Sequence, residues 1–269
     1  MTQRKPAALL AAGRISESPL RHLPGLAGQI GPVWAANTGL TTKFVRTLRA
    51  GHAARDPAVL DACPLWILHG PGCKVEQLIG LILQTHLPLK DRMVALFDDG
   101  AGTEALGRLK ARGALVGAFW GQGAHYFVEG DAPVVRAVME MLRHARLSAH
   151  RLRSGTRQIF TTASTAANSL MVPVFETIAR SLESAGVARP VSQRIVLRWM
   201  ESLARAYAAS GRKAWIDPTL HGRNARLHAG VQEIRTTDPE LASILEEALS
   251  VSLRMIRGSA SKAAGGASE

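Results

Sequence analysis

The sequence predicts an α/β N-terminal domain followed by an all-α C-terminal domain. Within residues 93–131, short apolar runs alternate with an amphipathic helical segment and with acidic or glycine-rich turns. This alternation is the pattern of βαβ units, which build parallel sheets. From about Ser154 onward, strand-like runs disappear and apolar residues recur at helical spacing, as they do between Leu170 and Leu182.

Apolar runs in the first part have the length and flanking turns of buried strands. They lie at residues 7–12, 32–36, 64–68, 93–97, 115–119, 126–129 and 149–152. Helical patterns separate them, because polar residues interrupt the apolar ones at a period of three to four. These helices are expected after Gly13, at residues 38–49, 75–83 and 103–112, as a short turn at 56–62, and from Pro133 with Asp131 as the N-cap.

The domains are expected at residues 1–153 and 154–257, with a flexible tail at 258–269 that contains few apolar residues. In the second domain, Pro173 should bend the first long helix and residues 210–224 should form a loop. The uncharged helix around residues 159–175 is apolar on most faces, so we expect a homodimer in which a second copy covers it.

Composition argues against several classes of protein. The net charge is +12, but aromatic residues are only 5% and the arginines are dispersed, so nucleic-acid binding is not favoured. The apolar run near the N-terminus is too short for a signal peptide, and polar side chains within residues 158–175 argue against a membrane span. Two cysteines without a metal-ligand spacing predict a cytoplasmic protein with no metal site.

The turn after the first apolar run carries part of a dinucleotide-binding fingerprint. Of the three glycine positions, here held by Ala11, Gly13 and Ser16, only the middle one is glycine. That glycine allows a pyrophosphate to approach the backbone at the start of a helix. Gly13, Arg14 and Ile15 are therefore candidate cofactor-binding residues, and the alternative is a vestigial turn.

The next two strand ends add further cofactor candidates. Asn37 and Thr38 follow the second strand without an Asp or Glu to bind an adenosine ribose, which favours NADP over NAD. Thr38 could hold the extra phosphate together with Lys43 or Arg46, unless these residues only start and solubilise a helix. Gly70 could let the cofactor pass over the third of the predicted strands, although the HGPGCK segment does not fit a P-loop.

Asp98 and Asp99 follow the fourth predicted strand, where they could serve as a base or metal carboxylate, or cap a turn. Neither HExxH nor GxSxG occurs in the chain.

Three segments carry a resemblance to a known family: residues 12–15, 127–131 and 167–170. The chain resembles bacterial Rossmann-like proteins with a helical C-terminal dimerisation domain, which are related to ketopantoate and pyrroline-carboxylate reductases.

This resemblance implies a Rossmann-like first domain, a nicotinamide cofactor and a substrate in the crevice between the domains. In relatives the equivalent of residues 119–123 is usually a histidine-proline segment that faces the crevice, and this chain departs from it with the sequence GAFWGQG. Related hydroxyacid dehydrogenases place a lysine one helical turn before an asparagine, and here Ser164 precedes Asn168. Because serine is no cationic acid, the proton would come from Lys213, His221 or His228.

Asn168, Ser164 and Lys213 are thus the catalytic candidates, although Asn168 could instead satisfy backbone groups. The arginines and lysine of residues 212–226 could bind an acidic substrate or simply lie on the surface. The expected function is that of an NADP-dependent oxidoreductase acting on a small molecule. The alternative is a non-catalytic scaffold that binds a metabolite or a protein partner.

Overall fold

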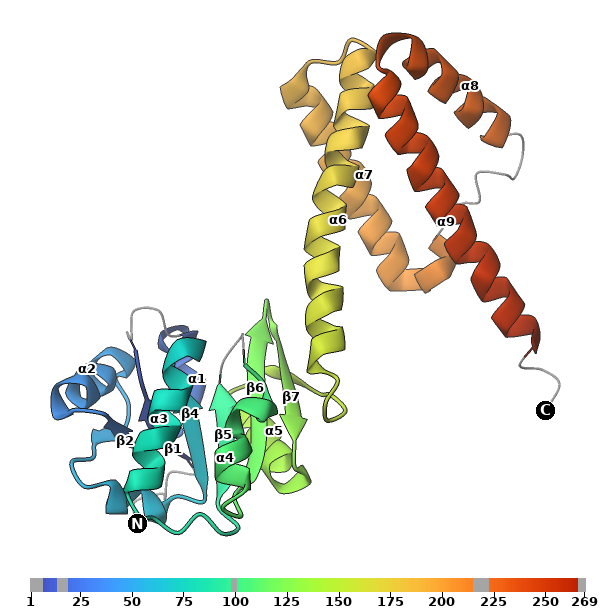
Figure 1. The fold of residues 1–269 in the computed structure, drawn as a ribbon. Helices are drawn as coiled ribbons and strands as arrows, with labels where there is room; N and C mark the ends of the chain where they lie inside the picture. Colours follow the sequence, from blue (N-terminus) through green and yellow to red (C-terminus); the bar gives the residue numbers. More distant parts are fainter. Residues whose placement is uncertain (1–6, 14–18, 98–100, 215–222, 266–269) are drawn as a thin grey trace. The chain divides into compact units, whose positions relative to one another are not determined.

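The computed structural model describes residues 7–13, 19–97, 101–214 and 223–265. Contacts within the chain divide it into two compact units, Met1–Thr161 and Thr162–Glu269. The first unit contains a single mixed sheet, and the second is helical among the residues that the structure describes (Figure 1). Within these same residues, no helix is both long and apolar enough to cross a membrane.

The sheet of the first unit has the strand order β3-β2-β1-β4-β5-β6-β7-β8. Neighbouring strands are parallel except for β6 and β7, which form an antiparallel hairpin. The strands are β1 (Ala7–Ala11), β2 (Ile30–Ala35), β3 (His52–Ala53), β4 (Leu65–His69), β5 (Met93–Phe97), β6 (Leu115–Gln122), β7 (His125–Gly130) and β8 (Ser148–Arg151).

Helices cover both faces of this sheet, because successive strand side chains point to opposite faces and both sets are apolar. Leu9, Ile67 and Phe97 belong to one buried cluster, and Leu10 and Trp66 belong to the other. The first cluster packs under η2 (Pro19–His22), α1 (Pro24–Ala27), α2 (Thr38–Leu48) and α5 (Ala132–His144). The second packs under η3 (Pro57–Ala62), α3 (Gly72–Gln84), η4 (Thr103–Leu106) and α4 (Gly107–Lys110).

Strand β1 lies between β2 and β4, so the chain leaves the centre of the sheet in two opposite directions. In open α/β sheets such a switch in direction leaves a crevice beyond the carboxyl ends of the two central strands. Here that place is the edge formed by Ala11 of β1 and His69 of β4, which are paired in register. The order of the sheet therefore points to the turns after these two strands as the candidate site.

Every predicted strand is present, with ends shifted by up to three residues. The sequence missed β3, because its two residues, His52 and Ala53, are both exposed and show no apolar pattern. The helix predicted at residues 103–112 is split into η4 and α4. Asp131 holds the N-cap position of α5, but it makes no capping bond: its Oδ2 accepts from the amide of Val116 at 2.8 Å.

The second unit consists of α7 (Arg189–Ser210), η5 (Gly211–Ala214), α8 (Arg223–Thr237), α9 (Pro239–Gly265) and most of α6 (Arg157–Ser184). The loop predicted at 210–224 thus contains η5, and its residues 215–222 lie outside the described part. Residues 258–265 continue α9 rather than forming an irregular tail, since alanine, serine and lysine tolerate a helix.

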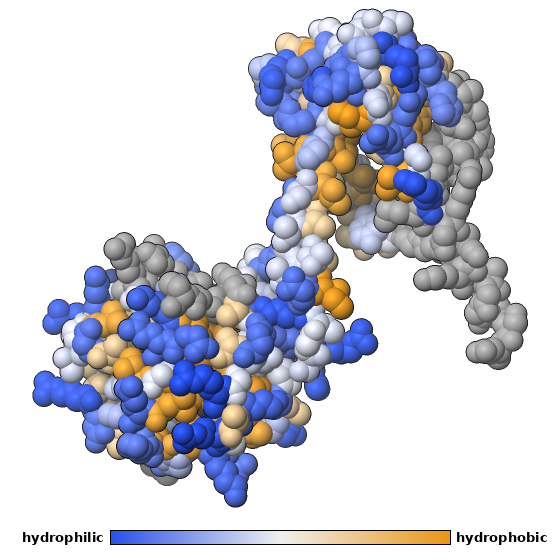
Figure 2. Space-filling view, in the orientation of Figure 1, coloured by the Kyte–Doolittle hydropathy of each residue, from blue (hydrophilic) through white to orange (hydrophobic). Residues whose placement is uncertain are grey.

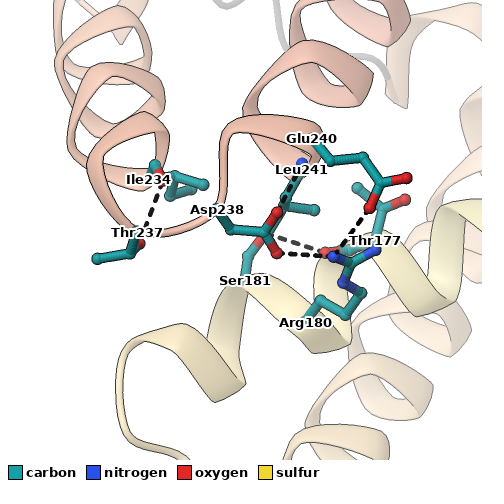
Figure 3. Close-up of polar contacts among 8 residues, drawn as sticks. All are labelled: Thr177, Arg180, Ser181, Ile234, Thr237, Asp238, Glu240 and Leu241. Atoms are coloured by element: carbon teal, nitrogen blue, oxygen red, sulfur yellow. Dashed lines mark hydrogen bonds and ion pairs between the residues drawn. The ribbon is translucent and has the colours of Figure 1, made fainter.

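An ion pair joins α6 to the start of α9 in this unit (Figure 3). Arg180 Nη2 donates to Asp238 Oδ2 at 2.7 Å and approaches Glu240 Oε2 at 3.5 Å. Asp238 also accepts from the amide of Leu241 at 3.0 Å, and this bond, aided by Arg180, lowers the pKa of Asp238. The carboxylate therefore caps α9 and holds α6 against it.

At the opposite edge of the sheet from the candidate site, Arg92 ties the loop before β5 to the segment before β4. Its guanidinium carbon lies 5.0 Å from the ring centroid of Trp66, and its Nη1 donates to the carbonyl of Cys63 at 2.7 Å. Arg92 also pairs with Asp61, and only 14% of its side chain is exposed. A stacked and hydrogen-bonded arginine of this kind contributes packing as well as charge.

We expect Arg92→Ala to lower the free energy of unfolding by about 1–3 kcal/mol, because it removes buried packing and several hydrogen bonds together. Urea unfolding followed by circular dichroism measures this change. Arg108→Ala is the matched control, since Arg108 pairs with Glu76 while 57% of its side chain is exposed. That control should change stability by less than about 0.5 kcal/mol. Equal effects of the two substitutions would contradict the assignment.

Candidate functional site

The turns after β1 and β4 pack directly against each other. The amide of Ala12 donates to the carbonyl of His69 at 2.9 Å. Gly13 has φ +81°, and a Cβ added there would lie 2.5 Å from Cδ of Pro71. A Cβ on Gly70 would lie 3.1 Å from the carbonyl oxygen of Ala12. Both glycines are therefore required for the close approach of the two turns, and Gly13 also for its left-handed backbone.

These turns include two of the predicted cofactor-binding residues, Gly13 and Gly70, and the structure brings them together. Arg14 and Ile15 lie outside the described residues. The space that a Cβ on either glycine would occupy is filled by the other turn, so the two glycines serve the packing of the turns. In dinucleotide-binding folds, glycines at this position also let a pyrophosphate approach the backbone.

The start of α2 lies beside these turns, since Ala35 of β2 is paired with Ala11 of β1. Asn37 is the N-cap of α2, and its Oδ1 accepts from the amide of Leu40 at 2.8 Å. The oxygen of the Asn37 side chain is thus used within the helix rather than held for a ligand. Thr38 is exposed at the first helical position, and the first turn carries no acidic residue. A helix start of this kind favours an anion.

Three aromatic rings lie next to one another at the carboxyl ends of the central strands. His69, Phe97 and Phe119 occupy paired positions on β4, β5 and β6. Their ring centroids are 5.4 Å apart for His69 and Phe97, and 4.6 Å apart for Phe97 and Phe119. The Nδ1 atom of His69 lies 2.9 Å from the carbonyl oxygen of Phe97. Because a carbonyl only accepts, Nδ1 must carry a hydrogen, and Nε2 is the atom that can take up a proton.

The sequence did not single out His69 as a site residue. Its signal was present, because a lone histidine ends the otherwise apolar strand LWILH at the carboxyl edge of the sheet. The ring is buried, and its tautomer is fixed by a backbone group of the neighbouring strand. Such fixing is typical of histidines that hold a defined orientation in a site.

The β6–β7 hairpin extends past the ends of its neighbours. Strand β5 pairs with β6 only as far as Phe119, whereas β6 continues to Gln122 and pairs there with His125. A Cβ on Gly121 would lie 2.9 Å from the ring of Tyr126, so the ring lies across this glycine. Residues 117–122 therefore belong to an extended strand, and the ring of Tyr126 packs against it.

A buried acid and a buried arginine lie under η4. Glu129 of β7 is 1% exposed and Arg157, at the start of α6, is 7% exposed. The guanidinium carbon of Arg157 lies 4.0 Å from the ring centroid of Trp120. Burial raises the pKa of Glu129, while Arg157 and hydrogen bonds from the amides of Thr103 and Gly155 act in the opposite direction.

This cluster links the loop that follows β5 to the segment that enters α6, because Glu129 contacts backbone groups of both. Glu129 Oε2 is buried and makes no hydrogen bond. Neither charge was predicted to be functional, since Glu129 is a single acid in the apolar strand YFVEG and Arg157 is one of many arginines. Position in the fold, rather than residue type, distinguishes them.

The catalytic candidates belong to the second unit. Asn168 is exposed and Ser164 half-buried on α6, and Lys213 is exposed on η5. Ser164 and Asn168 share a face of α6, as their spacing of four residues requires. Asn168 is exposed in the single chain rather than buried within its own unit. His228 is exposed on α8, and His221 lies outside the described residues, as do Asp98 and Asp99.

Searches for similar proteins find solved structures that match nearly the whole chain. BF3122 of Bacteroides fragilis, a proposed NADP oxidoreductase, is 12% identical with a TM-score of 0.70 over 92% of this chain and 96% of its own. Pyrroline-5-carboxylate reductase from Coxiella burnetii is 10% identical, with a TM-score of 0.56 over 92% and 98%. A reductive aminase from Aspergillus terreus, solved with NADPH and ethyl levulinate, is 17% identical, with a TM-score of 0.54 over 94% and 95%.

No protein-family model and no curated protein matches the chain. The similarity to these structures is therefore one of fold. It confirms the predicted Rossmann-like N-terminal domain and helical C-terminal region, and it agrees with the observed strand order. It also confirms that the expected likeness to pyrroline-carboxylate reductases holds at the level of the fold.

The raised pKa of Glu129 predicts how stability depends on pH. Because the pKa of Glu129 is higher in the folded protein than in the unfolded chain, stability falls as pH rises from the ordinary pKa of a glutamate through the raised pKa. Glu129→Gln never ionises. We therefore expect the free energy of unfolding of the wild type, relative to Glu129→Gln, to decrease as pH rises above the ordinary pKa of a glutamate.

Urea unfolding at several pH values measures this difference. Glu140→Gln on the exposed surface of α5 is the control for loss of one carboxylate. A difference that increases with pH over the same interval would show that the ion pair with Arg157 outweighs the burial of the carboxylate.

Proposed function

We propose that this protein is an oxidoreductase that uses NADP(H) and acts on a small molecule. The observation that carries the proposal is the pair of glycine turns at the switch point of the sheet, where Gly13 and Gly70 let the turns after β1 and β4 pack closely together. In the proposed complex the pyrophosphate lies at the turn after β1 and the rest of the cofactor passes over Gly70 toward His69. The bound cofactor would supply or accept a hydride.

Preference for the phosphorylated cofactor is supported by the end of β2. Ala36, Asn37 and Thr38 offer no carboxylate to an adenosine ribose, and Thr38 begins a helix whose start favours an anion. Lys43 and Arg46 are exposed further along the same helix and add positive charge. The reductive aminase with a similar fold was solved with NADPH, which agrees with this preference.

Reduction of a carbonyl or imine also needs a proton and an oriented substrate. We propose Asn168 as a hydrogen-bonding residue, with Ser164 on the same face of α6. Serine cannot deliver a proton as a cation would, so Lys213 is our candidate for the acid. Arg14 and Ile15 are retained as proposed cofactor contacts because they follow Gly13 directly.

Titration with NADPH tests the proposal. We expect saturable enhancement of nicotinamide fluorescence at or below millimolar cofactor, with NADPH bound more tightly than NADH. Gly13→Ala should weaken binding by about tenfold or more, because the new Cβ strains the left-handed turn and pushes against Pro71. Gly186→Ala is the matched control: Gly186 has φ +89° but open space around it.

A double variant with Lys43→Ala and Arg46→Ala distinguishes loss of the proposed phosphate contacts from unfolding of the domain. This double variant should lose its preference for NADPH while still binding NADH. Absence of binding to the wild type at millimolar cofactor would exclude the oxidoreductase and leave the non-catalytic scaffold as the better interpretation.

We also propose that the protein is a homodimer formed through its helical unit. Large apolar side chains are exposed on the surface of this unit, with Leu170 65% exposed on α6 and Trp199 52% exposed on α7 (Figure 2). Trp199, Leu203 and Tyr207 follow one another at a spacing of four, so they form a stripe along α7. A second copy is the proposed cover, because an isologous contact would bury the same stripe twice.

Sedimentation velocity tests the dimer. Leu203→Glu should shift the protein toward the monomer, since it places a charge in the apolar stripe. Arg205→Ala, on another side of α7 where Arg205 pairs with Glu201, should leave the oligomeric state unchanged. A wild type that sediments as a monomer at micromolar concentration would contradict the proposal.

A further inference from the structure

Two histidines on neighbouring strands face each other at the outer edge of the sheet. Nδ1 of His125, on β7, lies 3.0 Å from Nε2 of His150, on β8, and the ring centroids are 5.2 Å apart. The hydroxyl of Ser148 lies 3.3 Å from the same Nε2 of His150. All three residues are exposed, so solvent and dissolved ions reach them.

The register of the two strands explains why these groups meet. His125 is paired with Ser148, and Phe127 is paired with His150. Side chains two residues apart on a strand share a face, so both histidines and the serine lie on one face of the sheet. Arg151, the next residue along β8, points to the opposite face and does not place its charge beside the imidazoles.

Packing holds one of the two rings in place. The ring of Phe127 lies between His150 and Phe160, with centroid distances of 5.5 and 4.3 Å. The backbones of β7 and β8 are hydrogen-bonded to each other. The strand pairing and the ring of Phe127 therefore hold the ring of His150 in place beside His125.

We propose that His125 and His150 bind a divalent transition-metal ion such as Zn²⁺, Cu²⁺ or Ni²⁺. Imidazole is a preferred ligand of these ions. Metal–nitrogen bonds are about 2.0–2.1 Å long, so two nitrogens at right or tetrahedral angles on one ion lie roughly 2.9–3.4 Å apart. The observed 3.0 Å falls within this interval. Water would complete the coordination, with the Ser148 hydroxyl beside it.

Binding requires a lone pair on both facing nitrogens. In the hydrogen-bonded pair of neutral rings, one of these nitrogens carries a hydrogen that the other accepts. That ring must move its hydrogen to its other nitrogen, which changes the tautomer and leaves the number of bound protons unchanged. No oxidation or reduction is involved.

The ion would join the last strand of the sheet to its neighbour. Strand β8 pairs only with β7 among the described strands, so no second backbone ladder holds it. A ligand that binds only the folded state stabilises the protein, and the gain grows with the logarithm of the ligand concentration divided by the dissociation constant. Added Zn²⁺ should therefore raise the melting temperature of the wild type.

Cu²⁺ titration of the metal-stripped full chain, made without a histidine tag, tests the proposal. Electron paramagnetic resonance should show one copper bound through two imidazole nitrogens. His125→Ala and His150→Gln should each weaken this binding by about tenfold or more. Losing a residue that only supports a metal ligand already lowers metal affinity by this amount, and losing the ligand itself should lower it at least as much. Glutamine at 150 can still hydrogen-bond to His125, so this variant keeps the contact between the strands.

His52→Ala is the matched control, because His52 is also an exposed strand histidine. It should leave the copper spectrum and the Zn²⁺-induced rise in melting temperature unchanged. Copper binding to the wild type that persists unchanged in His150→Gln, or a spectrum with a single imidazole nitrogen, would overturn the proposal. NADPH titration of the same variants reports on a separate site, so either proposal can fail alone.

Discussion

The hydrogen bond from the amide of Ala12 to the carbonyl of His69 joins the two turns at the centre of the first unit. Strands β1 and β4 can lie this close at their carboxyl ends only because Gly13 and Gly70 lack side chains. The order of the strands changes direction at this place, and the start of α2 and the rings from His69 to Phe119 lie at the same edge of the sheet.

Much of the first unit could be predicted from the sequence, because buried strands are apolar over their whole length and their ends carry turn residues. The glycines at 13 and 70 were identified for the same reason. Strand β3 was not predicted, because its pairing is short and its side chains are exposed. Arg157 and Glu129 were not predicted to be buried, because a buried charge cannot be told from a surface charge in a sequence. Only the packing of Trp120 and η4 against them shows that they are buried.

The helical unit was predicted as helical from its apolar spacing, but the spacing overstated how much of it is buried. Leu170 and Val174 follow the pattern of a core helix and are nevertheless exposed, whereas Ala179 and Val196 are buried. Periodicity shows which residues share a face of a helix, but it does not show which helix, sheet or second chain covers that face. Asn168 illustrates this limit, since its place on α6 was predictable and its exposure was not.

Glu129 accepts hydrogen bonds from the backbone at Thr103, which begins η4, and at Gly155, just before α6, while Arg157 at the start of α6 stacks on Trp120. One carboxyl group thus serves as the common anchor of two segments that are more than fifty residues apart in sequence. The start of η4 and the segment that enters α6 therefore depend on one buried side chain of β7 for their mutual position.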